Sequence, residues 1–233
     1  MKKKKLIAWM VHLYTASGGV IGMMALFAAA DGQVRTAFFL LCIATLVDAT
    51  DGILARKAQV SWVLPQFSGA MIDNVIDVLT FVWVPVFIMG SQNLLPSLAW
   101  TAVPILAALY AYGQVNMKTE DSFFLGFPSY WNFIALYMFW LRPEPIIAVL
   151  MLIIPGILSF IPTRYLYPSK NPILSKTSWL MGLVWAVMVL YLLTQETPNQ
   201  NLVLASLFYP IYYLVLSFYL DLRFRQGKLV SSR

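Results

Sequence analysis

Long apolar runs, separated by short polar turns, dominate this chain of 233 residues. A helix that crosses a bilayer needs about 20 mainly apolar residues, so each long run is a candidate span. The pattern predicts eight helices, at residues 6–30, 35–54, 67–90, 94–115, 127–141, 145–161, 177–194 and 201–220. The fifth and sixth are short, so they either tilt or form a hairpin that does not cross fully. We therefore expect one all-α domain over residues 1–233, built as a polytopic transmembrane helical bundle.

The composition agrees with a membrane protein. Hydrophobic residues make up 60% of the chain and charged residues 11%, whereas soluble domains are about 25% charged. The single cysteine, Cys42, excludes an internal disulfide, and a packing role is expected for it in its apolar run. The lysines at 2–5 precede an apolar run without a convincing cleavage site, so we expect no cleaved signal.

The positions of lysine and arginine predict the orientation of the spans, because cytoplasmic loops collect positive charge. With the amino terminus inside, fourteen of the sixteen cations fall on the inner side and only Arg35 and Arg142 on the outer side. Both termini are therefore expected to be cytoplasmic. The basic inner face predicts contact with anionic membrane phospholipids, and no nucleic-acid partner is expected.

Four of the ten acidic residues lie inside the second and third predicted spans, namely Asp48, Asp51, Asp73 and Asp77. Their spacings of three and four place each pair on one helix face. A charged side chain in hydrocarbon is costly, so such residues indicate function. At about 1.5 Å per residue, Asp48 and Asp77 lie about 12 to 15 Å from the inner helix ends, and the other two about 8 to 9 Å. Two antiparallel neighbours would gather all four near the cytoplasmic surface.

Four carboxylates this close repel one another unless positive charge lies between them. All-oxygen ligands suit Mg²⁺, Mn²⁺ or Ca²⁺, and two bridged ions would form a clamp for phosphoryl transfer. The alternative is that the acids only hold helices together. Small residues surround them, at Ala49, Gly52, Ala55, Gly69 and Ala70. These residues permit either tight helix packing or the approach of a nucleotide or phosphate to the backbone.

The acidic segment resembles the signature of the CDP-alcohol phosphotransferase family, Asp-x2-Asp-Gly-x2-Ala-Arg, a spacer, and Gly-x3-Asp-x3-Asp. All eight fixed positions are present, at Asp48, Asp51, Gly52, Ala55, Arg56, Gly69, Asp73 and Asp77. The spacer after Arg56 holds twelve residues, more than in most of the family. In the length of this spacer, and in the stretches "VHLYTASG" and "EDSFFLGFPSYWNF", the chain is similar to the branch of the family whose acceptor alcohol is choline. Many relatives carry Pro-Asn-x-x-Thr on the first helix, where this chain has Val11, His12 and Thr15.

The resemblance implies that CDP-diacylglycerol and choline react to give phosphatidylcholine and CMP. It implies that Asp48, Asp51, Asp73 and Asp77 hold the divalent cations, two ions of Mg²⁺ or Mn²⁺, and that Asp77 is also the general base. It further places the cytidine nucleotide against Gly52, Ala55 and Gly69, with Arg56 facing the phosphates. A homodimer in a bacterial inner membrane, with its active site facing the cytoplasm, is the implied assembly.

Choline carries a quaternary ammonium, for which aromatic faces and carboxylates are the natural partners. The inner ends of the predicted spans and the following loop supply candidates: His12, Tyr14, Tyr112, Asn116, Glu120, Asp121, Tyr130 and Trp131. An ordinary interfacial belt of Trp and Tyr is the alternative for the aromatic ones. The basic stretch "PTRYLYPSKNPILSK" contains Arg164, which either binds a phosphate or belongs to a positive-inside loop.

Two other functions are open at this point. The acceptor alcohol in the same reaction could be serine, glycerol phosphate or inositol phosphate, although a phosphorylated acceptor calls for more cations near the site. The chain could instead be an intramembrane cation transporter whose aspartates form the ion path. Clustering near one membrane face argues against a transporter, because transport sites usually lie near the midplane.

Overall fold

The computed structural model describes residues 2–117, 119, 123–167 and 175–226. In chain order the elements are α1 (Lys2–Ala30), α2 (Val34–Lys57), α3 (Val60–Val63), α4 (Gly69–Asp77), η1 (Val78–Trp83), α5 (Val84–Ser91), η2 (Leu98–Thr101), α6 (Ala102–Gly113), β1 (Phe123–Leu125), α7 (Trp131–Leu141), α8 (Pro145–Phe160), β2 (Arg164–Leu166), α9 (Ser175–Thr194), α10 (Gln200–Ser206) and α11 (Phe208–Arg225).

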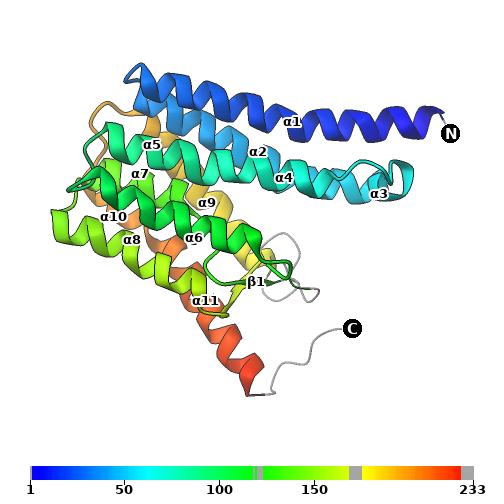
Figure 1. Ribbon diagram of the computed structural model, residues 1–233. Helices are drawn as coiled ribbons and strands as arrows, with labels where there is room; N and C mark the ends of the chain where they lie inside the picture. The colour runs from blue at the N-terminus through cyan, green and yellow to red at the C-terminus, as the bar shows by residue number, and fades with distance from the viewer. Residues whose placement is uncertain (1, 118, 120–122, 168–174, 227–233) are drawn as a thin grey trace.

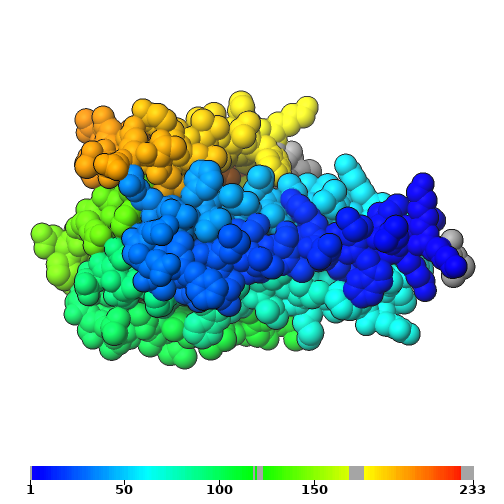
Figure 2. All heavy atoms as spheres, turned by 90° about the horizontal axis from the view of Figure 1, so that it is seen from above, coloured from blue at the N-terminus to red at the C-terminus, as the bar shows by residue number. Residues whose placement is uncertain are grey.

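The long helices run side by side as a bundle (Figure 1). Helix α1 packs along α2 and also contacts α4 and α5, while α7 contacts α5 and α6 contacts α8. Seen from above, α1 crosses the middle of the molecule, and its first turns project beyond the other helices (Figure 2). The short helix α3 lies beside this projecting part, where Val60 packs on Ala8 and Val11. The bundle is therefore longest at the amino end of α1, beside the segment that connects α2 to α4 (Figure 1).

The predicted spans are confirmed in part. Among the described residues, five stretches are helical, long and apolar enough to cross a membrane, at Lys2–Ala30, Val34–Lys57, Gly69–Ser91, Lys176–Thr194 and Gln200–Arg225. The other three are shorter apolar helices, at Leu98–Gly113, Trp131–Leu141 and Pro145–Phe160. The fourth segment is thus shorter than we predicted, whereas the fifth and sixth are short, as we predicted. The chain is a polytopic helical membrane protein.

One helix changes its winding directly after Asp77. Residues 78–83 form the π-helical turn η1, in which the backbone N–H of Val84 donates to the Leu79 carbonyl five residues back. Pro85 follows this turn and has no N–H to donate to the carbonyl of Phe81, four residues earlier. This lost α-helical bond accounts for the wider turn. π-Helical turns inside α-helices often lie at functional sites, because they change the direction in which side chains point.

The all-α prediction requires one correction, since β1 and β2 pair as a small antiparallel hairpin with Phe124 opposite Tyr165. Helix α11 holds β2 in place. The Asp221 carboxylate accepts a bond from the Arg164 backbone N–H at 3.1 Å, and the Ser217 hydroxyl accepts one from the Leu166 N–H at 3.1 Å. Strands of three residues are too short to show a period in sequence, so only the tertiary contacts reveal them.

Candidate active site

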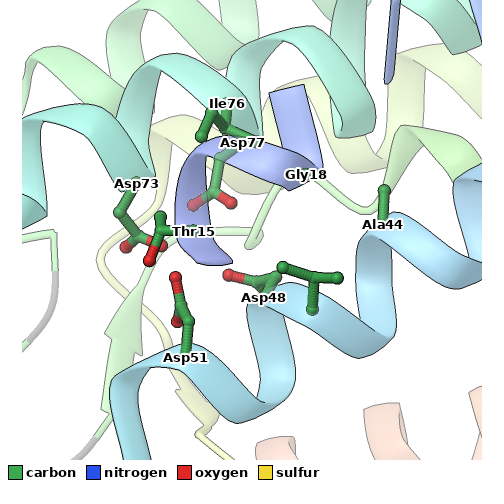
Figure 3. A pocket seen from close by; sticks show the side chains of 9 residues that line it. Thr15, Gly18, Ala44, Asp48, Asp51, Asp73, Ile76 and Asp77 are labelled. Carbon is green, nitrogen blue, oxygen red and sulfur yellow. The ribbon is translucent and has the colours of Figure 1, made fainter. Parts of the chain in front are cut away.

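The four aspartates converge on one small cavity between α1, α2 and α4. Figure 3 shows the side chains of Asp48 and Asp51 on α2, and of Asp73 and Asp77 on α4, pointing toward one another. Thr15 of α1 borders the same space. The structure therefore confirms the prediction that two neighbouring helices bring the four aspartates together. Asp51 and Asp77 are each only 7% exposed, and Asp48 and Asp73 are half-buried.

Gly18 of α1 packs between the two acidic helices. A Cβ atom added at Gly18 would lie 3.4 Å from Cγ2 of Ile76 and 3.6 Å from Cγ1 of Val47. Ile76 precedes Asp77 on α4, and Val47 precedes Asp48 on α2. These are ordinary van der Waals distances, so Gly18 marks the point where α1 packs against both acidic helices.

The carboxylate geometry fits a divalent cation. One oxygen each from Asp48, Asp73 and Asp77 lie within 4.8 Å of one another. Ligand oxygens on opposite sides of a Ca²⁺ or Mg²⁺ ion are about 4 to 5 Å apart. The cavity volume of about 10 Å³ is close to the space that a single water molecule occupies. Asp51 lines the same cavity but does not belong to this group of three. Hard oxygen donors of this kind suit Mg²⁺ or Mn²⁺.

The residues expected to face the nucleotide lie toward the carboxyl end of α2 and at the amino end of α4, and none of them lines the cavity. A Cβ at Gly69 would approach Cε1 of His12 to 2.9 Å, so glycine here accommodates the imidazole ring. At Gly52 a Cβ would lie 3.3 Å from a guanidinium nitrogen of Arg56, which folds back along its own helix. Ala55 packs against the cluster formed by α1 and α3.

Arg164 is the fifth residue expected to bind nucleotide or phosphate. It lies on β2, and its guanidinium carbon sits 3.7 Å from the ring centre of Phe224. Arg164 is not among the residues that line the carboxylate cavity. The structure therefore places Arg164 with the hairpin and α11, on a different element from Arg56, which lies on α2.

The candidate choline residues separate into distinct surroundings. His12 packs edge-on against Phe67 at 4.6 Å between ring centres, and the Tyr14 hydroxyl bonds to that of Thr50 at 2.7 Å. Trp131 is fully buried against Phe127, whereas Asn116 is exposed. Glu120 and Asp121 lie outside the described residues. Tyr112 and Tyr130 remain, and both lie near enough to Asp48 for its charge to act on their phenol groups.

Several residues that line the cavity were not in the predicted set of site residues, namely Thr15, Gly18, Ala44, Val47 and Ile76. Ala44 and Val47 lie four and one residues before Asp48, and Ile76 lies one before Asp77. The helical spacing of Ala44 was a usable signal. The role of Gly18 depends on packing between three helices, which a single sequence does not show.

The fold and the site define the class: a polytopic membrane protein whose neighbouring helices bring together carboxylates that could hold a divalent cation. No family model matches the chain. It is 37% identical to the phosphatidylcholine synthase of Legionella pneumophila over 91% of this chain and 88% of that protein. It is 36% identical to that of Rhizobium meliloti, over 82% and 81%, and 32% identical to that of Pseudomonas aeruginosa, over 89% of each. The chain belongs to the family of bacterial phosphatidylcholine synthases.

Proposed function

We propose that this chain transfers the phosphatidyl group of CDP-diacylglycerol to choline and releases CMP. The observation that carries this proposal is the carboxylate cluster of Asp48, Asp73 and Asp77, in a chain that aligns with phosphatidylcholine synthases over most of its length. A phosphoryl transfer needs little from the protein beyond positioning and charge stabilisation. A small acidic cavity next to the membrane supplies both.

The proposed chemistry balances without a further reactant. Asp77 takes the proton of the choline hydroxyl while the choline oxygen forms a bond to the phosphorus of the phosphatidyl group. The bond from that phosphorus to the oxygen of CMP breaks, and CMP leaves with the electron pair. Bound cations, two ions of Mg²⁺ or Mn²⁺ held by Asp48, Asp51, Asp73 and Asp77, would neutralise the diphosphate and the leaving group.

The remaining roles follow from the family motif and belong to the same proposal. Gly52, Ala55 and Gly69 would lie along the cytidine nucleotide, and Arg56 would face its phosphates. Arg164 would contribute a second phosphate contact from the hairpin. The structure limits how a nucleotide could lie at Gly69, because the His12 ring already occupies the space next to that glycine. A nucleotide at Gly69 would therefore also contact His12.

The arrangement in the membrane is part of the proposal as well. Cation counts favour cytoplasmic termini and an active site that faces the cytoplasm of a bacterial inner membrane. All eight apolar helices would then cross or enter the bilayer as one domain over residues 1–233, and two copies would form a homodimer.

A CMP-release assay on the purified protein tests the function. CDP-diacylglycerol would be offered with choline, ethanolamine, serine, glycerol phosphate or inositol phosphate, first with Mg²⁺ and then with Mn²⁺. We expect release with choline well above the other acceptors, and none after chelation of the metal. Release with serine or a phosphorylated alcohol but not with choline would assign a different acceptor. Cation flux without CMP release would instead favour a transporter.

A further inference from the structure

A second cavity lies at the end of the bundle opposite the amino terminus, where the turn between α1 and α2 is found (Figure 1). It opens to the surface and has a volume of about 390 Å³, within the range of about 300 to 1,000 Å³ that ligand pockets occupy. Its lining comes from residues 32–36 at the start of α2, Gln92 after α5 and Phe139 of α7. Arg35 precedes Asp48 by thirteen residues on α2, which is about 20 Å along the helix. This cavity is therefore separate from the candidate active site.

Two guanidinium groups come together at this second cavity. Arg35 lines it directly, and Arg142 contacts two of the other lining residues. The Arg142 Nη1 donates a hydrogen bond to the Gln92 carbonyl at 2.8 Å, and its guanidinium carbon lies 5.4 Å from the ring centre of Phe139. A guanidinium group has several N–H donors, so a bond to Gln92 leaves Arg142 with donors for an anion. Because the planar guanidinium matches the spacing of phosphate oxygens, the two arginines suit a phosphate group.

A carboxylate already lies beside Arg35, where an anionic oxygen of a ligand would bind. Glu196 Oε1 is 3.7 Å from Arg35 Nη2, and the Glu196 side chain is 89% exposed. An ion pair this long and this exposed contributes little stability, so a phosphate can displace the carboxylate at small cost. The displaced Glu196 carboxylate then lies next to the phosphate and attracts a positive group there. This end of the bundle thus offers both signs of charge to one ligand.

An apolar face of α2 continues from Arg35 toward the middle of the bundle. Phe39, Ile43 and Leu46 follow Arg35 at intervals of four, four and three residues, and this spacing places them on one face of the helix. Their side chains are 42%, 37% and 62% exposed, respectively. An acyl chain that lies along this face buries apolar surface, whereas a free phosphate gains nothing from it. The cavity and this face together therefore fit a phospholipid whose headgroup lies at Arg35.

We propose that the second cavity binds the headgroup of a zwitterionic phospholipid from the leaflet at that end of the bundle. Arg35 and Arg142 hold the phosphate, and Glu196 attracts the ammonium group. A headgroup with only negative charge binds less well, because the Glu196 carboxylate repels it. This inference goes beyond the proposed function and does not depend on it, since no aspartate of the active site takes part.

The test measures how four probes raise the unfolding temperature of the purified full-length chain in detergent, because a ligand of the folded state stabilises it. The probes are dihexanoylphosphatidylcholine, dihexanoylphosphatidylglycerol, glycerophosphocholine and inorganic phosphate. We expect Kd for the phosphatidylcholine to be about 5-fold lower than for the phosphatidylglycerol, and about 10-fold lower than for either probe without acyl chains. The same titration of Asp77→Asn, with a chelator present, should give an unchanged Kd, which separates this cavity from the active site.

Three variants assign the roles of the charged side chains. Arg35→Gln and Arg142→Gln should each raise Kd for both lipids about 3- to 10-fold, because each removes charged donors to the phosphate. Glu196→Gln should keep the binding of phosphatidylglycerol and abolish the preference for phosphatidylcholine. Arg223→Gln is the matched control, because the Arg223 guanidinium also lies near an aromatic ring, 5.9 Å from the centre of Tyr219, but in the last turn of α11. This control should keep both Kd values.

Two results would overturn the inference. One is a folded Arg35→Gln protein that keeps the wild-type Kd for phosphatidylcholine, which would show that the lipid binds elsewhere on the surface. Arg35 is the decisive position, because its side chain is 42% exposed and its replacement should not impair folding. The other is equal affinity of the wild-type chain for the two lipids, or for phosphatidylcholine and inorganic phosphate. Failure of the proposed function has a different signature, because CMP release with choline would then be absent while lipid binding at this cavity persists.

Discussion

The helices at the two ends of the chain are held together by different kinds of contact. In the small-residue half, made of α1, α2, α4, η1 and α5, glycines allow close approach, so that a Cβ at Gly22 would meet Cγ2 of Thr80 at 2.7 Å. In the aromatic half, made of α7, α9, α10 and α11, rings fill the space between helices, as where Phe133 lies 4.8 Å from Trp185.

This difference has a functional consequence. Close backbone approach in the small-residue half brings carboxylates from two helices within 4.8 Å of each other. Rings with few rotamers keep the aromatic half in one shape, and buried hydrogen bonds between Tyr137, Ser206 and Trp185 join three of its helices. One half therefore supplies reactive groups and the other supplies a rigid wall beside them. Variants on each side should accordingly affect different measurements.

The largest expected effect lies in the small-residue half, at Asp77. Asp77→Asn removes the proposed base and one carboxylate of the cluster, so kcat for CMP release should fall about 10²- to 10⁴-fold. The control is Asp31→Asn, because Asp31 is exposed in the turn after α1 and should tolerate the change. Both proteins should unfold at similar temperatures in detergent. A fully active Asp77→Asn protein would falsify the proposed base.

The second prediction concerns helix contact rather than chemistry. Gly22→Ala places a methyl group 2.7 Å from Thr80 and 3.0 Å from Leu79, both in η1. Overpacking of this kind costs about 1 to 3 kcal/mol of stability. Because η1 directly follows Asp77, we expect a lower kcat as well. Unfolding in mixed micelles would measure the stability and CMP release the activity.

Gly113→Ala is the matched control for Gly22→Ala, since nothing lies within 4 Å of a Cβ at Gly113. It should change stability by less than about 0.5 kcal/mol. Equal losses in the two variants would show that contact with η1 does not determine the result, because helix propensity alone favours alanine over glycine at both positions.

The buried hydrogen bonds between Tyr137, Ser206 and Trp185 in the aromatic half should affect stability alone. Tyr137→Phe removes the hydroxyl that bonds to Ser206 Oγ at 2.8 Å and accepts from Trp185 Nε1 at 3.0 Å. Interhelical hydrogen bonds in membrane proteins contribute about 0.6 to 1.7 kcal/mol. We expect a loss in that range with kcat per folded molecule unchanged. Tyr191→Phe, at a side chain that is 55% exposed, is the control. A large fall in kcat would show that the aromatic half takes part in catalysis more directly.

The small-residue half was more accessible to sequence reasoning than the aromatic half, for a physical reason. The spacing of the acids along the sequence gives the helix face on which Asp48 and Asp77 lie, and the distance to the helix end gives their depth. Both properties are local in the chain. The proximity of Tyr112 and Tyr130 to Asp48 arises from packing between separate elements, which no local pattern encodes. The sequence therefore predicted the acids and their meeting point, but only a broad set of aromatic residues.

The secondary structure shows the same division. Long apolar runs predicted where the helices lie, because length and hydropathy are local properties. The hairpin of β1 and β2 was missed, since it depends on bonds from Asp221 and Ser217 on a distant helix. The π-helical turn had one local signal, Pro85, but proline by itself also predicts a kink or a helix end.

The smallest expected effect lies where the two halves meet. Asn132 of α7 donates to the Thr45 hydroxyl of α2 over 3.5 Å, a long bond, and Thr45 also donates to the Leu41 carbonyl at 2.9 Å. Such geometry is weak, so a double-mutant cycle of Thr45→Val and Asn132→Ala should give a coupling energy below about 0.6 kcal/mol. The two halves would then be joined mainly by apolar packing. A coupling energy above about 1.5 kcal/mol, measured by unfolding in mixed micelles, would show instead that this polar contact fixes the position of α7, and with it Tyr130, relative to Asp48.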